Sequence, residues 1–214
     1  IKDCKGAPWR KSGEAMDIGT IVHDTISEFH GEEIKFREND DEFSSKEARI
    51  WFEKIIKKEK KDRKLKAEFV KKMQNCISAF LEWREEAEFV IVASEFTVYS
   101  DTNKYAGTVD ALGYIKGKLS LIDYKTSSSI WPEHDLQAVS YQDALNEMYQ
   151  RKQIEIDEAV NDIYIINFNK EGALDKKKVE NHREALAVFL GLKSAFVANQ
   201  IWESATKLPK AQNN

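Results

Sequence analysis

The sequence of 214 residues contains only two cysteines and three prolines. Cys4 and Cys76 are too few for a disulfide framework or a four-cysteine metal cluster, which favours a reducing environment inside the cell. No stretch approaches the roughly 18 consecutive apolar residues of a membrane span, so we expect a soluble, cytoplasmic protein without membrane contact. The sequence begins at Ile1, without methionine or a charged-then-apolar leader, so we leave open whether a further segment precedes it.

Several signatures of catalysis and nucleotide binding are also missing. The sequence has no G-x-x-x-x-G-K-[ST] phosphate loop, so we expect neither a fused motor nor a nucleotide cofactor. It also has no G-x-S-x-G, H-E-x-x-H or paired C-x-x-C motif. These absences remove a nucleophilic serine at a strand–helix turn, a helical zinc-peptidase site and a cysteine zinc site from consideration.

The charge is distributed unevenly along the chain. The whole sequence has 33 basic and 37 acidic residues, a net charge of −4, whereas residues 54–72 alone carry +7. A local basic surface of this kind can bind nucleic acid although the protein is acidic overall. A solvated helix face is the plainer alternative for a charged run taken by itself.

The hydrophobic periodicity predicts an α/β fold, because helical spacing alternates with short β-branched runs. We predict a first helix that stops at Gly31, and a small mixed sheet covered by helices. The charged run from Lys57 to Lys64 has no apolar member, so it either projects as a helix or breaks the element in two. The predicted elements are helices over 17–30, 46–88, 133–150 and 181–201, and strands over 89–100, 105–115, 119–125 and 163–168.

Two polar positions interrupt the apolar rows of the predicted strands. In Ile122-Asp123-Tyr124-Lys125, alternation places Asp123 and Lys125 on one face and Tyr124 on the other. Asp110 ends the run Gly107-Thr108-Val109-Asp110 on the preceding strand, so hairpin pairing can bring it beside Asp123. A partly exposed ion pair between strands is the plainer interpretation of any one of these residues alone.

The three residues together favour a catalytic metal site. Two neighbouring carboxylates resist ionisation in a dry site, and a hard divalent cation such as Mg²⁺ removes that conflict. An adjacent lysine can then stabilise a metal-activated water as it attacks a phosphodiester. We therefore expect phosphodiester hydrolysis by in-line attack.

The same motifs resemble the central motif of the PD-(D/E)XK nuclease superfamily. Two flanking motifs, Gly19-Thr20-Ile21-Val22-His23 and Gln137-Ala138-Val139-Ser140-Tyr141, are similar to those of its RecB-like exonuclease branch. The four motifs follow the family's order from Gly19 to Tyr141. The resemblance implies a restriction-endonuclease-like core in α-βββ-α-β order, formed by a single domain over 1–214 with a basic helical insertion at about 46–88.

The resemblance also implies the role of each site residue. His23, Asp110, Asp123 and the main-chain carbonyl of Tyr124 would ligate Mg²⁺ or Mn²⁺, with Glu95 as a weaker candidate ligand. Lys125 would act on the attacking water and the scissile phosphate. Gln137 and Tyr141 would steady Lys125 or hold the DNA backbone. Taken alone, His23, Gln137 and Tyr141 also fit ordinary boundary or surface positions of their helices.

The expected substrate is linear DNA, single- or double-stranded. Lys57, Lys61 and Lys64 would contact phosphates, and Trp131, which follows the Lys125 strand, would stack on unpaired bases. We expect an exonuclease, with two alternatives: a structure-selective endonuclease, or a non-catalytic DNA-binding module that keeps the fold. A separate helicase or recombination partner is compatible with the sequence, which leaves the oligomeric state, polarity and pathway open.

Overall fold

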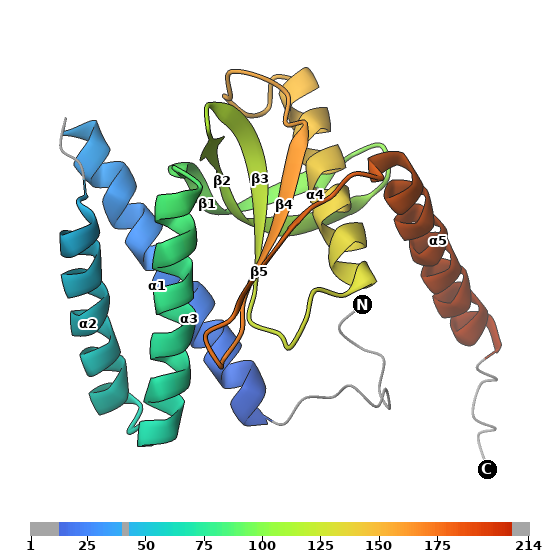
Figure 1. Ribbon diagram of the computed structural model, residues 1–214. Helices are drawn as coiled ribbons and strands as arrows, with labels where there is room; N and C mark the ends of the chain where they lie inside the picture. Colours follow the sequence, from blue (N-terminus) through green and yellow to red (C-terminus); the bar gives the residue numbers. More distant parts are fainter. Residues whose placement is uncertain (1–12, 40–42, 207–214) are drawn as a thin grey trace, which may run out of the picture.

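The computed structural model describes residues 13–39 and 43–206 (Figure 1). It has five helices and five strands within these residues, which confirms the predicted α/β class. The helices are α1 (Gly13–Glu38), α2 (Ser45–Asp62), α3 (Ala67–Glu86), α4 (Pro132–Gln150) and α5 (His182–Thr206). The strands are β1 (Val90–Ser100), β2 (Tyr105–Ile115), β3 (Lys118–Lys125), β4 (Asp162–Phe168) and β5 (Leu174–Lys178).

The strands form one mixed sheet in the order β1-β2-β3-β4-β5. Neighbouring strands are antiparallel except β3 and β4, which are parallel and are joined through α4. A parallel pair needs such a crossover, because the chain must return to the starting edge before the second strand. The mixed sheet and its crossover helix therefore agree with the predicted restriction-endonuclease-like core.

Each face of the sheet has its own apolar core, and Figure 1 shows α1, α2 and α3 on one side and α4 and α5 on the other. Ile122 and Tyr124 of β3 belong to the core under α1 and α3, whereas Leu119 and Leu121 belong to the core under α4. Because both faces are covered, the residues of β3 between Lys118 and Lys125 are all buried, the polar Ser120 and Asp123 included. The predicted alternation of side chains along this strand is confirmed.

Helix α1 is longer than its sequence predicted. Ile18, Val22, Ile26 and Phe29 form its buried stripe, as expected, but the helix continues through Gly31 to Glu38. The predicted stop at Gly31 was therefore wrong. A glycine inside a helix costs only about 1 kcal/mol, and burial of His30 and Glu33 on either side of Gly31 holds the backbone in place.

The region predicted as one helical segment over 46–88 is two helices. Ser44 begins α2 with a capping box, in which its hydroxyl accepts from the Glu47 amide and the Glu47 carboxylate accepts from the Ser44 amide. The charged run forms the end of α2 and the connection to α3, where Lys64 adopts a positive φ of 53°. Of the two predicted possibilities, the charged run therefore breaks the element in two.

Strand β5 was not predicted. Its sequence, LDKKK, has one apolar residue and three lysines, so it lacks the alternation that marks a strand. It pairs antiparallel with β4 at the edge of the sheet. Lysines on an edge strand discourage pairing with further chains, so the feature that hid this strand in the sequence suits its position.

Helix α5 packs against α4 near its start and is exposed over much of its length. Several of its large apolar side chains lie in solvent, among them Val188, Leu192, Ile201 and Trp202. By length and composition, residues His182–Ser204, with a mean hydropathy of 1.3, could cross a membrane. The unbroken apolar run sought in the sequence is absent, because Lys193, Asn199 and Glu203 interrupt it. One such helix is weak support for a membrane protein.

Candidate active site

The site lies where strands β2 and β3 separate. Their pairing ends at Ala111 and Ile122, and beyond that point β3 continues beside β4. Asp110 is the next residue, and its Oδ2 accepts a hydrogen bond of 2.7 Å from the Tyr124 amide. Val109 packs in the core under α4 and Ala111 in the opposite core, so the regular alternation of β2 breaks at Asp110. This break and the separation of the strands admit the Asp110 carboxylate between them.

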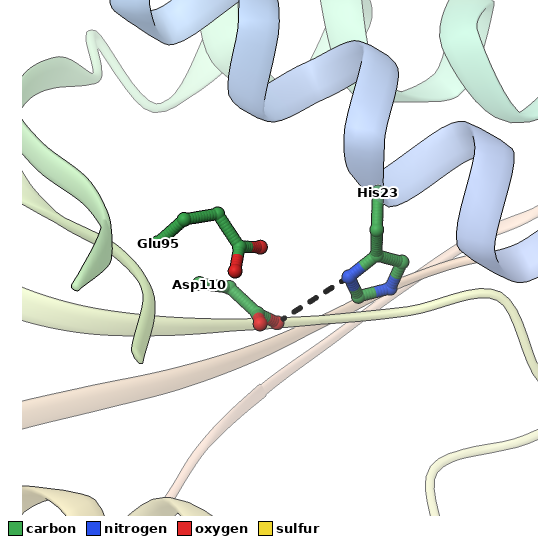
Figure 2. A group of neighbouring side chains, drawn as sticks. All are labelled: His23, Glu95 and Asp110. Carbon is green, nitrogen blue, oxygen red and sulfur yellow. Dashed lines mark ion pairs between the residues drawn. The ribbon is translucent and has the colours of Figure 1, made fainter. Parts of the chain in front are cut away.

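Three potential metal ligands converge on this point. One ligand atom each of His23, Glu95 and Asp110 lies within 4.8 Å of the other two. Figure 2 shows His23 reaching down from α1 while Glu95 and Asp110 approach from the sheet, with His23 Nδ1 3.8 Å from Asp110 Oδ2. Residues from α1, β1 and β2 are thus brought together, although the sequence separates His23 from Asp110 by 87 positions.

Gly19 explains how α1 comes this close to the sheet. A Cβ atom at Gly19 would lie 2.9 Å from the Thr126 hydroxyl oxygen, which is shorter than real contacts of this kind. The missing side chain lets the helix pass against the segment that follows β3. His23, one turn further along α1, is then carried toward Asp110.

Glu95 reaches the site through an unusual backbone conformation. Its φ of 49° lies in the left-handed region, which costs a residue other than glycine roughly 1–3 kcal/mol. Such strain is typical of functional sites, where the surrounding structure holds it in place. Desolvation, followed by the negative charge of Asp110, raises the pKa of the Glu95 carboxyl. The residue that was the weaker candidate from sequence therefore has a defined place beside His23 and Asp110.

Asp123 lies deeper than the other acids and is 2% exposed. Its Oδ2 is 2.5 Å from the Lys125 ammonium nitrogen, so the two form an ion pair on one face of β3. Desolvation raises the pKa of Asp123 to about 6, against the attraction of Lys125, and the negative charge of Asp110 adds to the rise. The acid and the base of the central motif are thus adjacent, as alternation predicted.

The electrostatics of the site suit a divalent cation. Burial raises the pKa of Asp110, and the same effect lowers the pKa of His23 to about 4, so His23 is a neutral imidazole at pH 7. Ligating histidines are neutral and ligating carboxylates are ionised, and a cation would add positive charge to that of Lys125, which alone does not offset the desolvation of Asp110 and Asp123. The donor set of one imidazole and several carboxylates therefore fits Mg²⁺ or Mn²⁺.

Lys125 is held from the opposite side by α4. Its ammonium group donates a hydrogen bond of 3.2 Å to Gln137 Oε1, and Gln137 Nε2 donates one of 2.7 Å to the Tyr141 hydroxyl. The Tyr141 ring in turn occupies the space beside Gly107, where a Cβ atom would lie 2.2 Å from the ring. The two outer motifs of the sequence are therefore in physical contact with the two strand motifs.

A cavity of about 510 Å³ is lined by His23, Glu95, Asp110 and Lys125. Asp123, Gln137 and Tyr141 are not among its lining residues in the part of the chain that the structure describes. Tyr124 lines it although its ring is buried in the core beneath, so its main chain faces the cavity, as a carbonyl ligand requires. Thr20, Asp24, Ser127 and His134 also line the cavity and were not predicted. The first two share a helix face with Gly19 and His23, a spacing that could have revealed them, whereas His134 carries no such signal.

The predicted DNA-contacting residues lie outside the cavity. Lys57, Lys61 and Lys64 are exposed near the end of α2, and none of them lines the cavity in the part of the chain that the structure describes. Trp131 is 47% exposed at the start of α4, close in sequence to the cavity residue His134. These four side chains are therefore exposed to solvent and do not line the cavity.

A mixed sheet with crossover helix, splayed central strands and an acid–acid–lysine group defines a nuclease core of the restriction-endonuclease type. The profile of the PD-(D/E)XK nuclease superfamily matches residues 3–207, and the chain belongs to that superfamily. A crystal structure from Eubacterium rectale, named "Putative exonuclease", matches with a TM-score of 0.46 and 16% identity over 73% of this chain and 68% of its own. The curated proteins contain no match to this sequence.

Proposed function

We propose that this protein is a divalent-metal-dependent DNA nuclease that degrades linear DNA as an exonuclease. The observation that supports it most directly is the meeting of His23, Glu95 and Asp110 beside the Asp123–Lys125 pair in a nuclease-superfamily chain. Acids alone would suit many cation sites, but the ammonium group beside them suits a reaction at an anionic phosphate.

The residues have separate tasks in this proposal. His23, Asp110, Asp123 and the Tyr124 carbonyl hold the cation, Mg²⁺ or Mn²⁺, with Glu95 as a further ligand. A bound divalent cation lowers the pKa of water and neutralises developing phosphate charge. Lys125 provides a positive charge at the cavity edge, where it orients the scissile phosphate and the attacking water. Gln137 and Tyr141 keep the ammonium group of Lys125 in place through their two hydrogen bonds.

DNA would reach the cavity across the exposed basic and aromatic groups. Lys57, Lys61 and Lys64 would bind phosphates without regard to sequence, and Trp131 would stack on an unpaired base. We propose that residues 1–214 act as one nuclease domain, with the helical insertion at about 46–88 providing the basic surface. A cytoplasmic location and a separate helicase or recombination partner belong to the same proposal.

The test is digestion of end-labelled single- and double-stranded DNA with Mg²⁺ or Mn²⁺, beside a closed circle. We expect linear DNA to be degraded and the circle to remain intact. Lys125→Ala should abolish cleavage, and Asp110→Asn should do the same while keeping an oxygen that accepts from the Tyr124 amide. Lys118→Ala, which removes an exposed lysine from the start of the same strand, is the matched control.

The outcomes separate the alternatives. Cutting of the circle or of branched DNA would indicate a structure-selective endonuclease with the same site. DNA binding without any cleavage or Mn²⁺ binding would indicate a non-catalytic module. Lys125→Ala that digests DNA at the wild-type rate would refute the proposed role of Lys125.

A further inference from the structure

A second polar group lies behind the site, inside the aromatic core shared by α1, α3 and β3. His30 is fully buried, with Nε2 3.0 Å from the Tyr124 hydroxyl and Nδ1 3.0 Å from Glu33 Oε2. The other oxygen of Glu33 accepts a hydrogen bond from the Arg84 guanidinium group. Four polar side chains from three elements thus form one continuous hydrogen-bonded network.

The hydrogen bonds of this network have a defined direction. The Glu33 carboxylate already accepts from Arg84, and a carboxylate cannot donate, so His30 Nδ1 carries the hydrogen that bonds to Glu33. Nε2 is then the acceptor, and the Tyr124 hydroxyl donates to it. This assignment of the tautomer follows from the partners of the ring.

Packing alone does not account for the network. The rings of Phe80 and Phe89 lie edge-on to His30, within 5.6 and 5.8 Å between centroids, so the surroundings are apolar. Polar groups in such a place cost free energy unless every partner is supplied, and apolar replacements of buried ion pairs are often neutral or stabilising. We infer that a chain that buries three such groups, His30, Glu33 and Tyr124, and pairs them with the partly exposed Arg84 gains something other than burial from them.

Tyr124 connects this network to the metal ligands. Its hydroxyl bonds to His30 on one side of β3, while its amide donates to Asp110 Oδ2 at 2.7 Å and its main chain lines the cavity. His30 follows His23 on α1 by seven residues, which is about 10.5 Å along the helix and close to the same face. One helix therefore meets the strand system at two points, through His30 in the core and through His23 at the site.

We propose that His30, held by Glu33 and Arg84, is a positioning residue for the metal site. Its bond to Tyr124 fixes α1 against β3, so that the His23 imidazole, the Asp110 carboxylate and the Tyr124 carbonyl face one cation. This inference rests on the proposed function. His30 itself touches no ligand or reacting atom and acts only through Tyr124.

The test is Mn²⁺ affinity measured by calorimetry on the folded chain. Tyr124→Phe removes one hydroxyl and keeps the ring, and His30→Leu removes the imidazole. We expect each to lower the affinity about tenfold, the lower end of the roughly 10–100-fold loss found when partners of metal ligands are removed. Both substitutions remove the same hydrogen bond between His30 and Tyr124. The variant that carries both should therefore bind Mn²⁺ no more weakly than the single variant with the lower affinity.

Two further variants distinguish positioning from general packing. His30→Gln keeps a polar group that can reach Tyr124, and we expect it to restore part of the Mn²⁺ affinity lost in His30→Leu. Phe52→Leu damages the same core without touching Tyr124, since Phe52 is a buried residue of α2 that packs on Phe29. It should lower thermal stability and leave the Mn²⁺ affinity unchanged.

A metal-free signal completes the test. The ¹⁵N–¹H resonance of the Tyr124 amide reports its bond to Asp110, and it should shift in His30→Leu but not in Phe52→Leu. Wild-type Mn²⁺ affinity in Tyr124→Phe and in a folded His30→Leu, with an unmoved Tyr124 resonance in each folded His30 variant, overturns the inference; if His30→Leu does not fold, wild-type affinity in Tyr124→Phe alone overturns it. If the wild-type chain neither binds Mn²⁺ nor cuts DNA, the proposed function fails, whereas the amide resonance still reports whether His30 positions this strand.

Discussion

Replacing Asp123 by asparagine should stabilise the metal-free protein, although it removes a residue of the proposed active site. Desolvation raises the pKa of this carboxyl from its ordinary value of 3.8 to about 6, so the folded state disfavours the ionised form. At about 1.36 kcal/mol for each pH unit, the penalty is about 3 kcal/mol once the pH exceeds both values. Asparagine cannot ionise, so Asp123→Asn avoids this penalty.

The direction of the pH dependence follows from the same shift. Because the folded state binds this proton more tightly than the unfolded chain, stability falls as the pH rises from about 4 to about 6 and stays lower above that range. His23 has the opposite effect, since its pKa of about 4 means that acid, rather than base, destabilises the fold through this ring. At pH 8 His23 is neutral in both states, so the comparison there isolates Asp123.

The assay is thermal unfolding in the presence of a chelator at pH 8 and pH 5. We expect Asp123→Asn to melt about 6–12 °C above the wild type at pH 8, since 1 kcal/mol corresponds to about 2–4 °C for a chain of this size. The difference should shrink at pH 5. Asp175→Asn, at an exposed position of β5, is the matched control and should change stability by less than about 0.5 kcal/mol.

Two results would refute the reasoning. The first is Asp123→Asn that is no more stable than the wild type at pH 8 without metal. The second is an equal advantage at pH 5 and pH 8, because a gain that ignores pH cannot come from ionisation. Addition of Mn²⁺ should reverse the order of stability at about 1,000 times its Kd, since a ligand that binds only the folded state then raises the wild-type stability by about 4.1 kcal/mol, more than the advantage of about 3 kcal/mol.

Three further predictions concern metal binding, packing and DNA affinity. Mn²⁺ affinity, measured by calorimetry between pH 5 and pH 8, should rise with pH through about 6, and binding should release protons, because Asp123 must ionise to bind the cation. An affinity independent of pH would contradict this prediction. Gly107→Ala should lower stability by about 1–3 kcal/mol and slow cleavage, because the added methyl group displaces the Tyr141 ring, and unchanged melting and kinetics would oppose it. Replacing Lys57, Lys61 and Lys64 together by alanine should reduce the slope of log K against log salt for double-stranded DNA by about 2.7, measured by fluorescence anisotropy, and an unchanged slope places the DNA elsewhere.

The sequence predicted the sheet well where β-branched and aromatic residues are concentrated. Such runs mark β1, β2, β3 and β4 to within one residue of their observed ends. It failed at β5, because this edge strand has one apolar residue and three lysines and so shows no alternation, and at Gly31, because tertiary burial on either side of the glycine overrode its helix-breaking tendency. Tertiary contacts, rather than the local sequence, determine the structure at both places.

The candidate site was predictable to a similar degree. Asp110, Asp123 and Lys125 follow from alternation and hairpin pairing, which act over short distances along the chain. The positive φ of Glu95 that turns its carboxyl toward Asp110 leaves no trace in the sequence pattern. His134 likewise enters the cavity only through the packing of α4 on the sheet. Local rules therefore found the strand residues, and the family resemblance supplied His23, Gln137, Tyr141 and, as a weaker candidate, Glu95. Only the structure placed Glu95 beside Asp110 and brought His134 to the cavity.

The fit between Gly107 and the Tyr141 ring couples the allowed side-chain sizes at two positions that are distant in the sequence. Any side chain larger than hydrogen at residue 107 needs the room that the tyrosine fills, so a bulkier residue there is compatible only with a smaller one at residue 141. Truncating the tyrosine would also release the glutamine that restrains Lys125. In a library with all residues at positions 107 and 141, active double variants should therefore be far rarer than the numbers of active single variants suggest. The chain between the two motifs could lengthen only where the Tyr141 ring still packs against the backbone of Gly107.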